Sequence, residues 1–214
     1  MADVLGLRFE KREHTNRVWQ FSMTLLAILV ALAVTAALIM FAGANIGEAF
    51  AGLYAGAFGS WKAILETLVK STPLILTGLA VCLAFRGKIM NIGAEGQFYT
   101  GAMAGYWAVI NFPALNPTLH IMVIFIAGFI GGALCGLIPG LLKGLLKVDE
   151  TIVTVLLNYV VKFVLSFFLA GIWQAPKEYY YISAPVPEEL HYPLLITNKR
   201  LHIGFLVALN EALI

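Results

Sequence analysis

The chain has 214 residues, of which 60% are hydrophobic and 12% charged, and its mean hydropathy is +0.86. A soluble domain of this length could not bury so much apolar surface, so the composition excludes an ordinary soluble protein and predicts a bilayer environment. The formal net charge of +2, carried by dispersed lysines and arginines, argues against a nucleic-acid-binding protein. Cys82 and Cys135 lie in apolar runs without ligand spacing, so we expect no disulfide, no metal site and no cofactor.

A basic tail, residues 1–19, precedes the first apolar run. From Phe21 to Phe41 this run carries no charge, and it matches the ~20 residues that cross ~30 Å of hydrocarbon. It is longer than the ~7–15-residue apolar region of a signal peptide, so we expect a retained span near 20–43. By the positive-inside rule, the cations of the tail place the N-terminus in the cytoplasm. They are Arg8, Lys11, Arg12 and Arg17.

Residues 44–60 are rich in glycine and alanine, with aromatic residues spaced among them. This stretch is too short and too polar to span, so it predicts an interfacial or re-entrant helix. The apolar run that follows predicts a second span near 66–86.

A polar heptapeptide, Asn-Ile-Gly-Ala-Glu-Gly-Gln at 91–97, lies between the second apolar run and the next. Glu95 has Gly93 and Gly96 close on either side, which favours irregular backbone near membrane depth. Such backbone is tolerated only where protein or a water-filled cavity supplies hydrogen-bond partners. We therefore expect a broken helix near 88–97 beside a transport pathway. The alternative is a purely structural role, in which the heptapeptide holds a tight helix break without touching substrate.

Further spans are expected near 97–112 and 119–142, and the second of these carries a row of glycines. The row has a period of four: Gly128, Gly132, Gly136, Gly140 and Gly144, with Gly131 and Pro139 beside it. Small residues at this spacing line one helix face and let another backbone approach closely in lipid. We expect helix packing there, with a gating hinge as the alternative. The proline should kink or break the helix.

A span near 151–172 follows Asp149 and Glu150 and carries a polar stripe. The stripe recurs every four residues on one slowly drifting helix face and consists of Thr154, Asn158, Lys162 and Ser166. Lys162 lies ~18 Å along the helix from Glu150, deep enough to need a partner, water or snorkelling. Either the stripe lines a pathway, or its amide and hydroxyl groups bond neighbouring helices while the lysine snorkels outward.

Counting crossings from a cytoplasmic N-terminus places the cationic turns at 86–88 and 143–150 inside and the segments 111–118 and 173–197 outside. The proline- and tyrosine-rich segment 173–200 favours an extended connector at the interfacial aromatic belt, or a surface for an external partner. The sequence has no His-Glu-x-x-His, nucleophile elbow or phosphate-binding loop, so we expect neither an enzyme nor an ATPase. The expected fold class is all-α, a polytopic transmembrane helical bundle.

Two segments, Asn91 to Gln97 and Asp149 to Tyr159, resemble the membrane permeases of bacterial ABC importers for nucleosides and simple sugars, with the nucleoside branch the more similar. The resemblance implies a permease domain over 20–214, in the inner membrane. It also implies partners: cytoplasmic ATPase subunits, a second permease subunit, an extracytoplasmic substrate-binding protein and membrane lipid, with no nucleic acid.

On that resemblance, Asn91, Glu95 and Gln97 would shape a broken helix beside the pathway. Four aromatic residues are candidates to stack on a base or a sugar ring: Phe98, Tyr99, Tyr106 and Trp107. Asn158 and Lys162 join them as candidate pathway residues. The family motifs themselves contain Gly93, Gly96, Asp149 and Glu150.

Members of that family continue through further spans, whereas the apolar run from His202 to Ile214 is too short to cross. We therefore expect a C-terminally incomplete permease that cannot couple to ATP alone. Two other classes stay open. One is a self-contained secondary carrier or channel in which Glu95 and Lys162 relay ions, although the heptapeptide has no second copy of the kind paired halves would give. The other is a non-transporting scaffold or remnant assembled through the glycine row.

Overall fold

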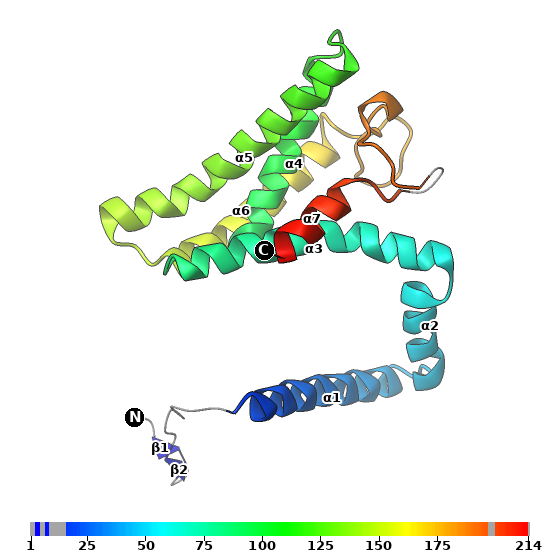
Figure 1. Ribbon diagram of the computed structural model, residues 1–214, viewed down its shortest axis with the longest axis vertical. Helices are drawn as coiled ribbons and strands as arrows, with labels where there is room; N and C mark the ends of the chain where they lie inside the picture. Colours follow the sequence, from blue (N-terminus) through cyan, green and yellow to red (C-terminus); the bar gives the residue numbers. More distant parts are fainter. Residues whose placement is uncertain (1–2, 5–6, 9–15, 197–199, 214) are drawn as a thin grey trace. The chain divides into compact units, whose positions relative to one another are not determined.

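The computed structural model describes residues 3–4, 7–8, 16–196 and 200–213. Its elements in chain order are β1 (Asp3–Val4), β2 (Leu7–Arg8), α1 (Arg17–Phe41), α2 (Ile46–Phe58), α3 (Trp61–Arg86), α4 (Ala94–Asn111), α5 (Pro117–Leu146), α6 (Glu150–Ala170), η1 (Glu188–Leu190) and α7 (Gly204–Leu213), as Figure 1 shows. The two short strands pair antiparallel. The predicted all-α helical fold is confirmed. Lys11 and Arg12 of the predicted basic tail lie outside the described residues.

Four helices of the described part are long and apolar enough to cross a membrane: α1, α3, α5 and α6. The chain is therefore a multi-pass membrane protein. A fifth crossing is predicted near 97–112, and α4 occupies this region. It has 18 residues but does not belong to the four helices that are apolar enough to cross a membrane. Its polar residues, including Glu95, Gln97 and Asn111, lower its hydropathy. At ~1.5 Å per residue α4 is ~27 Å long, so it approaches the ~30 Å of the hydrocarbon core.

The chain divides into two compact units, Met1–Ile64 and Leu65–Ile214. In the first, α1 ends in a turn at Gly43, whose φ of 76° is easily adopted only by glycine. The Asn45 side chain then caps α2 by accepting from the backbone N–H groups of Gly47 and Glu48. A short helix at the predicted position 44–60 is confirmed, and its place at the membrane surface stays a prediction.

In the second unit α4 packs against both α5 and α6 (Figure 1). Ala108 and Val109 of α4, Cys135 of α5 and Val161 of α6 are buried. His120 of α5 is also buried, and its Nε2 lies 3.2 Å from the carbonyl oxygen of Ala108. These contacts make α4 the centre of the unit.

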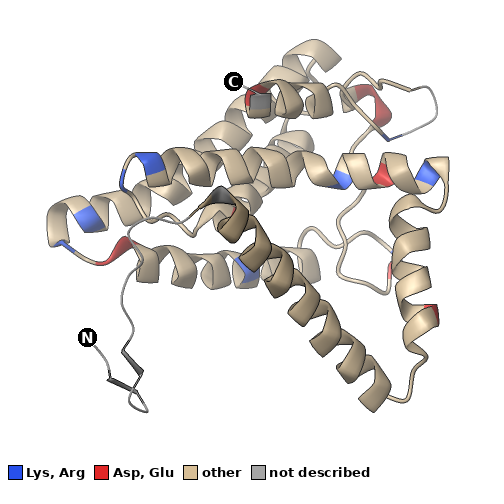
Figure 2. Ribbon diagram, turned by 60° about the horizontal axis from the view of Figure 1, so that its bottom comes forward, with Lys and Arg blue, Asp and Glu red and all other residues tan. Residues whose placement is uncertain are grey.

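The second half of α5 runs through Pro139 and stays helical to Leu146. Of the kink or break predicted at this proline, the break is not present, and the kink stays a prediction. Lys147 then ends the helix with a φ of 59°, and Lys143 forms an ion pair with Glu150 across the turn to α6. Figure 2 shows that the helices are largely free of charged residues along their length and that many of the charges lie at turns and helix ends, as a bilayer requires.

Candidate functional site

The predicted break between the second and third apolar runs is confirmed. Helix α3 ends at Arg86 and α4 begins at Ala94, and the intervening residues 87–93 are not helical. Of the heptapeptide, the first three residues belong to this break and the last four form the first turn of α4. The peptide groups of the break would be costly in a membrane unless other parts of the protein bonded to them.

Three polar side chains of α6, spaced by four residues, bond to the main chain of the break and the α4 start. The main-chain N–H groups donate as follows: Met90 to Glu150 Oε1 at 3.2 Å, Ile92 to Thr154 Oγ1 at 3.3 Å, and Gly96 to Asn158 Oδ1 at 2.8 Å. The irregular segment thus runs alongside α6 and obtains hydrogen-bond partners from the polar stripe. This arrangement meets the requirement that non-helical backbone at membrane depth be satisfied by protein.

Asn158 acts as the cap of α4 from another helix. The residue in the N-cap position is Gly93, which has no side chain to cap with. Gly96 is three residues into the helix, where a local cap would normally bond, and its N–H donates to Asn158 instead. The Nδ2 of Asn158 also donates to the carbonyl oxygen of Ile92 at 3.0 Å. One amide side chain therefore holds the end of the break against the start of α4.

Glu95 and Lys162 form an ion pair between α4 and α6. Their Oε1 and Nζ atoms lie 2.9 Å apart, and the side chains are 47% and 44% exposed. The ammonium group also lies 5.8 Å from the ring centroid of Tyr159. Because Lys162 is ~18 Å along α6 from Glu150, the pair lies well inside the span. Half-exposed charges at that depth face water or another polypeptide more favourably than hydrocarbon.

The two amide side chains of the heptapeptide lie on the side of the first turn of α4 that faces α5, away from the Glu95–Lys162 pair. Asn91 accepts from the N–H of Gly93 at 2.8 Å, and its Nδ2 lies 3.4 Å from Gln97 Oε1. A Cβ built on Gly136 would lie 3.1 Å from Gln97 Nε2, so this side chain crosses the glycine row of α5. The row therefore makes room for the first turn of α4.

The glycine row meets α4 over only part of its length. A Cβ on Gly128 would lie 3.3 Å from the carbonyl oxygen of Gly101, and one on Gly132 would lie 3.2 Å from that of Gln97. Gly140 and Gly144 have nothing within 4 Å. The first half of the row thus permits close helix packing, and the second half borders open space.

Replacing Gly131 with alanine should destabilise the α4–α5 contact. Its Cβ would lie 2.6 Å from Ala104 Cβ and 2.8 Å from the carbonyl oxygen of Thr100, so the helices would have to move apart. We expect a loss of about 1–3 kcal/mol of unfolding free energy, measured by denaturant titration in detergent micelles. Gly140→Ala is the matched control, because its added Cβ has nothing within 4 Å among the described residues. This substitution should be neutral or slightly stabilising. Equal effects of the two substitutions would contradict the close-contact assignment.

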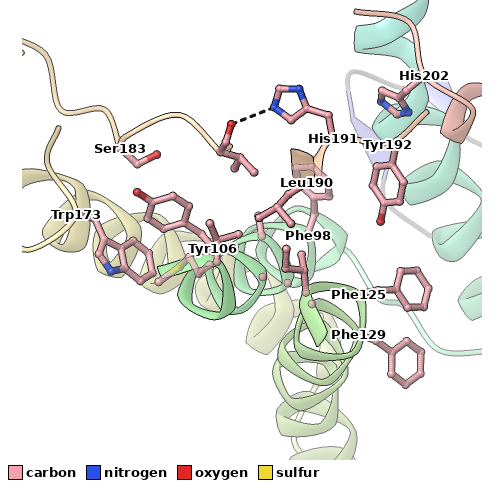
Figure 3. A pocket seen from close by; sticks show the side chains of 18 of the residues that line it. Phe98, Tyr106, Phe125, Phe129, Trp173, Ser183, Leu190, His191, Tyr192 and His202 are labelled. Carbon is pink, nitrogen blue, oxygen red and sulfur yellow. Dashed lines mark hydrogen bonds between the residues drawn. The ribbon is translucent and has the colours of Figure 1, made fainter. Parts of the chain in front are cut away.

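An aromatic cavity of about 1150 Å³ lies between α4, α5 and the segment 173–202 (Figure 3). The Tyr106 and Trp173 rings meet edge to face at 5.2 Å, and Trp173 stacks on Phe168 at 4.6 Å. The wall also carries polar groups, namely Ser183, His191, Tyr192, Arg200 and His202. His191 Nε2 lies 3.1 Å from the carbonyl oxygen of Val186, as the dashed line in Figure 3 shows. Aromatic faces beside hydrogen-bonding groups suit a flat, polar-edged ligand.

The structure separates the predicted pathway residues into three groups. Phe98 and Tyr106 line the aromatic cavity, whereas Asn91 and Gln97 line a second cavity beside α5. The remaining predicted residues line neither of these two cavities: Glu95, Tyr99, Trp107, Asn158 and Lys162. Tyr99 lies beside Phe98, and Trp107 packs edge to face against Phe112 at 5.8 Å.

Two of the contributing residues were not predicted as site residues. Thr154 is 1% exposed and bonds to the break, and its place in the four-residue stripe was the signal that could have identified it. Trp173 is 8% exposed and forms the end wall of the aromatic cavity. In the sequence it stands at the end of a span, where aromatic residues usually mark the membrane interface, so nothing distinguished it.

Comparison with known proteins identifies a family. The model of the family described as branched-chain amino acid transport system / permease component matches residues 63–194, more than half of the chain. No solved structure matches the chain.

Three curated relatives can be compared residue by residue. The chain is 37% identical over 92 residues to the guanosine ABC transporter permease protein NupP of Bacillus subtilis, 33% over 105 residues to the glucose ABC transporter permease protein TsgB13 of Haloferax volcanii, and 31% over 113 residues to the nucleoside ABC transporter permease protein NupB of Lactococcus lactis. These alignments cover 43%, 49% and 53% of the chain. They cover 26%, 28% and 31% of the relatives, so the chain spans about a quarter to a third of their length.

Proposed function

Because this chain belongs to the family of branched-chain amino acid transport system permease components, we propose that it forms part of the membrane permease of an ATP-driven ABC importer for nucleosides or simple sugars. The substrate class rests on the relatives, two of which are named for guanosine or nucleosides and one for glucose. The observation that carries the proposal is the helix break bonded to α6, with the Glu95–Lys162 pair half-exposed beside it. Such a break is stable at membrane depth only beside protein or a water-filled space.

On this proposal the pathway runs along the face of α4 and α6 that carries the ion pair. Glu95 and Lys162 contribute a polar wall, and Asn158 holds that wall in place through its bonds to Ile92 and Gly96. The aromatic cavity contributes ring faces for a base or a sugar through Tyr106 and Trp173. The 20–214 region acts as the permease domain, and ATP hydrolysis is supplied by separate cytoplasmic subunits.

The proposed complex also contains a second permease subunit and an extracytoplasmic substrate-binding protein, in a bacterial inner membrane. The N-terminus lies in the cytoplasm, because this orientation places Arg86, Lys88, Lys143 and Lys147 on the cytoplasmic side. A cysteine introduced at Tyr179, which is 91% exposed, should then react with a membrane-impermeant maleimide in intact spheroplasts. Reaction only after permeabilisation would reverse the orientation.

Deleting the gene from its host should abolish ATP-dependent uptake of a nucleoside or a simple sugar. We would measure uptake of radiolabelled guanosine, adenosine, glucose and ribose, with the gene restored on a plasmid as the control. Loss of one of these activities, with recovery on complementation, supports the proposal. Unchanged uptake of all four, in a strain without a second such transporter, would contradict it.

One observation favours a second candidate, a secondary carrier. The Glu95–Lys162 pair joins an acid and a base inside a span, as proton-coupled carriers do. The two candidates differ in their energy source. Uptake by an importer stops when ATP is depleted while the membrane potential is maintained, whereas uptake by a carrier stops when a protonophore is added at constant ATP.

A further inference from the structure

A second cavity of about 970 Å³, which adjoins the aromatic one at Gly128 and Phe129, lies between the end of α3, α5 and the start of α6. We call it the basic cavity, because three lysines line it against one carboxylate. These groups are Lys88, Lys143, Lys147 and Glu150. All four belong to the ends of helices or to the turns beside them, so the charges gather at one end of the cavity.

The lysines leave a net positive charge at this end. Lys143 is paired with Glu150, whereas Lys88 and Lys147 form no ion pair within the described part of the chain. The C-termini of α3 and α5 each contribute about −0.5 of a charge, and Asp149 in the turn after Lys147 contributes one negative charge, but Arg86 adds a positive charge beside Lys88, so the sum stays positive. Both lysines have a φ of 59°, in the left-handed region where glycine or asparagine would cost less. The local backbone therefore does not explain why lysine occupies these positions.

The remainder of the cavity is a slot along the glycine row, whose α5 wall is apolar and whose opposite wall includes Asn91, Gln97 and Thr154. Gly136, Gly140 and Gly144 line it together with Ala133 and Phe129, and a Cβ on Gly140 or Gly144 would meet nothing within 4 Å. From Lys147 to Gly136 the slot follows α5 for ~16 Å. One leaflet of the hydrocarbon core is ~15 Å deep, half of ~30 Å. The cavity thus combines a cationic mouth with a slot as deep as one leaflet, which is open beside Gly140 and Gly144.

We propose that the basic cavity binds one anionic phospholipid, with its phosphate between Lys88 and Lys147 and one acyl chain along the open half of the glycine row. Charge complementarity selects the headgroup, because basic pockets between transmembrane helices attract anionic lipid headgroups. The absence of side chains at Gly140 and Gly144 leaves room for the acyl chain. A lipid site goes beyond the proposed transport function, and its cationic mouth contains none of the residues assigned to the substrate pathway.

The test is native mass spectrometry of the full chain released from vesicles of phosphatidylglycerol and phosphatidylcholine in equal amounts. The wild-type chain should retain the anionic lipid in preference to the zwitterionic one. Lys88→Gln with Lys147→Gln should lower that preference about 10- to 30-fold. Lys62→Gln with Lys70→Gln, the same charge change on α3 outside the cavity, should leave it unchanged. Equal retention of the two lipids by the wild-type chain, or an equal loss in both double variants, would overturn the proposal.

A steric pair tests the slot without changing any charge. Gly140→Leu places a side chain in the slot and should reduce the retained phosphatidylglycerol to the level of phosphatidylcholine. Gly78→Leu, at an α3 glycine that also meets nothing within 4 Å but does not line the cavity, should have no effect. Circular dichroism of each variant checks that helix content is unchanged. If glycerol phosphate or inorganic phosphate displaces the lipid at equal headgroup concentration, the cavity is a phosphate site and the lipid assignment is wrong.

Discussion

Glu95→Gln and Lys162→Met should each lower substrate uptake by the proposed importer at least about tenfold. Each substitution leaves one charge of the 2.9 Å pair without its partner. At the depth of Lys162 in α6, a charge without its counter-ion needs water or another polar group beside it. Either change alters the α4–α6 face, and the uptake rate of radiolabelled nucleoside or sugar measures the effect.

The double variant, Glu95→Gln with Lys162→Met, separates a pathway role from a structural one. It removes both charges, so no unpaired ion is left in the span, and any loss of inserted protein that a single variant causes should be reversed. If the pair forms part of the pathway wall, uptake should stay low because the polar wall is gone. Recovery of both protein and uptake would mean that the pair only holds the helices together. Immunoblots of membrane fractions supply the protein amount in each strain.

Glu66→Gln is the matched control for the loss of an ion pair. Glu66 pairs with Arg200 at 3.6 Å, and the arginine side chain is 79% exposed. Exposed pairs contribute little to stability, so the amount of membrane protein should hardly change. If Glu66→Gln lowered the amount of membrane protein as much as Glu95→Gln does, the loss of any ion pair would be disruptive. The effect of Glu95→Gln would then not be specific to the α4–α6 face.

The positions of the helices could be predicted from the sequence because they depend on local signals. The apolar runs mark the spans, and side-chain caps mark several helix starts, such as Asn116 for α5 and Asp149 for α6. Helix α3 begins at Trp61, five positions before the predicted 66. The hydroxyl of Ser60 accepts from the N–H of Ala63 there, while Lys62 makes the first turns too polar for a hydropathy window to include.

The contacts of the site could be predicted only in part, because they join residues far apart in the chain. The four-residue spacing of the stripe predicts the polar face of α6. Nothing in the sequence indicates that Asn158 caps α4 by bonding to Gly96, which lies 62 positions earlier. For Lys162 the sequence allows three outcomes: an ion-pair partner, contact with water, or snorkelling to the interface. The structure shows the first of these, with Glu95 as the partner. Pairings of this kind follow from how α4 and α6 pack, which local propensity does not determine.

Among the uncharged residues of the polar stripe, Asn158 should show the largest effect of substitution on stability. Asn158→Leu keeps the approximate size of the side chain but removes both its bonds, those to the Gly96 N–H and the Ile92 carbonyl. Each unsatisfied main-chain group costs about 1–3 kcal/mol, so for two groups we expect a loss of about 2–6 kcal/mol of unfolding free energy. Titration of the purified chain with sodium dodecyl sulfate in mixed micelles, followed by circular dichroism, measures it.

Substitutions at two other residues of the polar stripe test whether the stability cost follows the hydrogen bonds that are lost. Thr154→Val removes one acceptor, bonded to the Ile92 N–H at a longer 3.3 Å, and should cost about 1–2 kcal/mol. Ser166→Ala removes a hydroxyl that donates only to the carbonyl oxygen of Lys162 in its own helix, so it should cost less than about 0.5 kcal/mol. The expected order of cost is therefore Asn158, Thr154, Ser166. If Asn158→Leu costs no more than Ser166→Ala, the break is held by packing alone, and the stripe's polar groups are then available to serve the pathway instead.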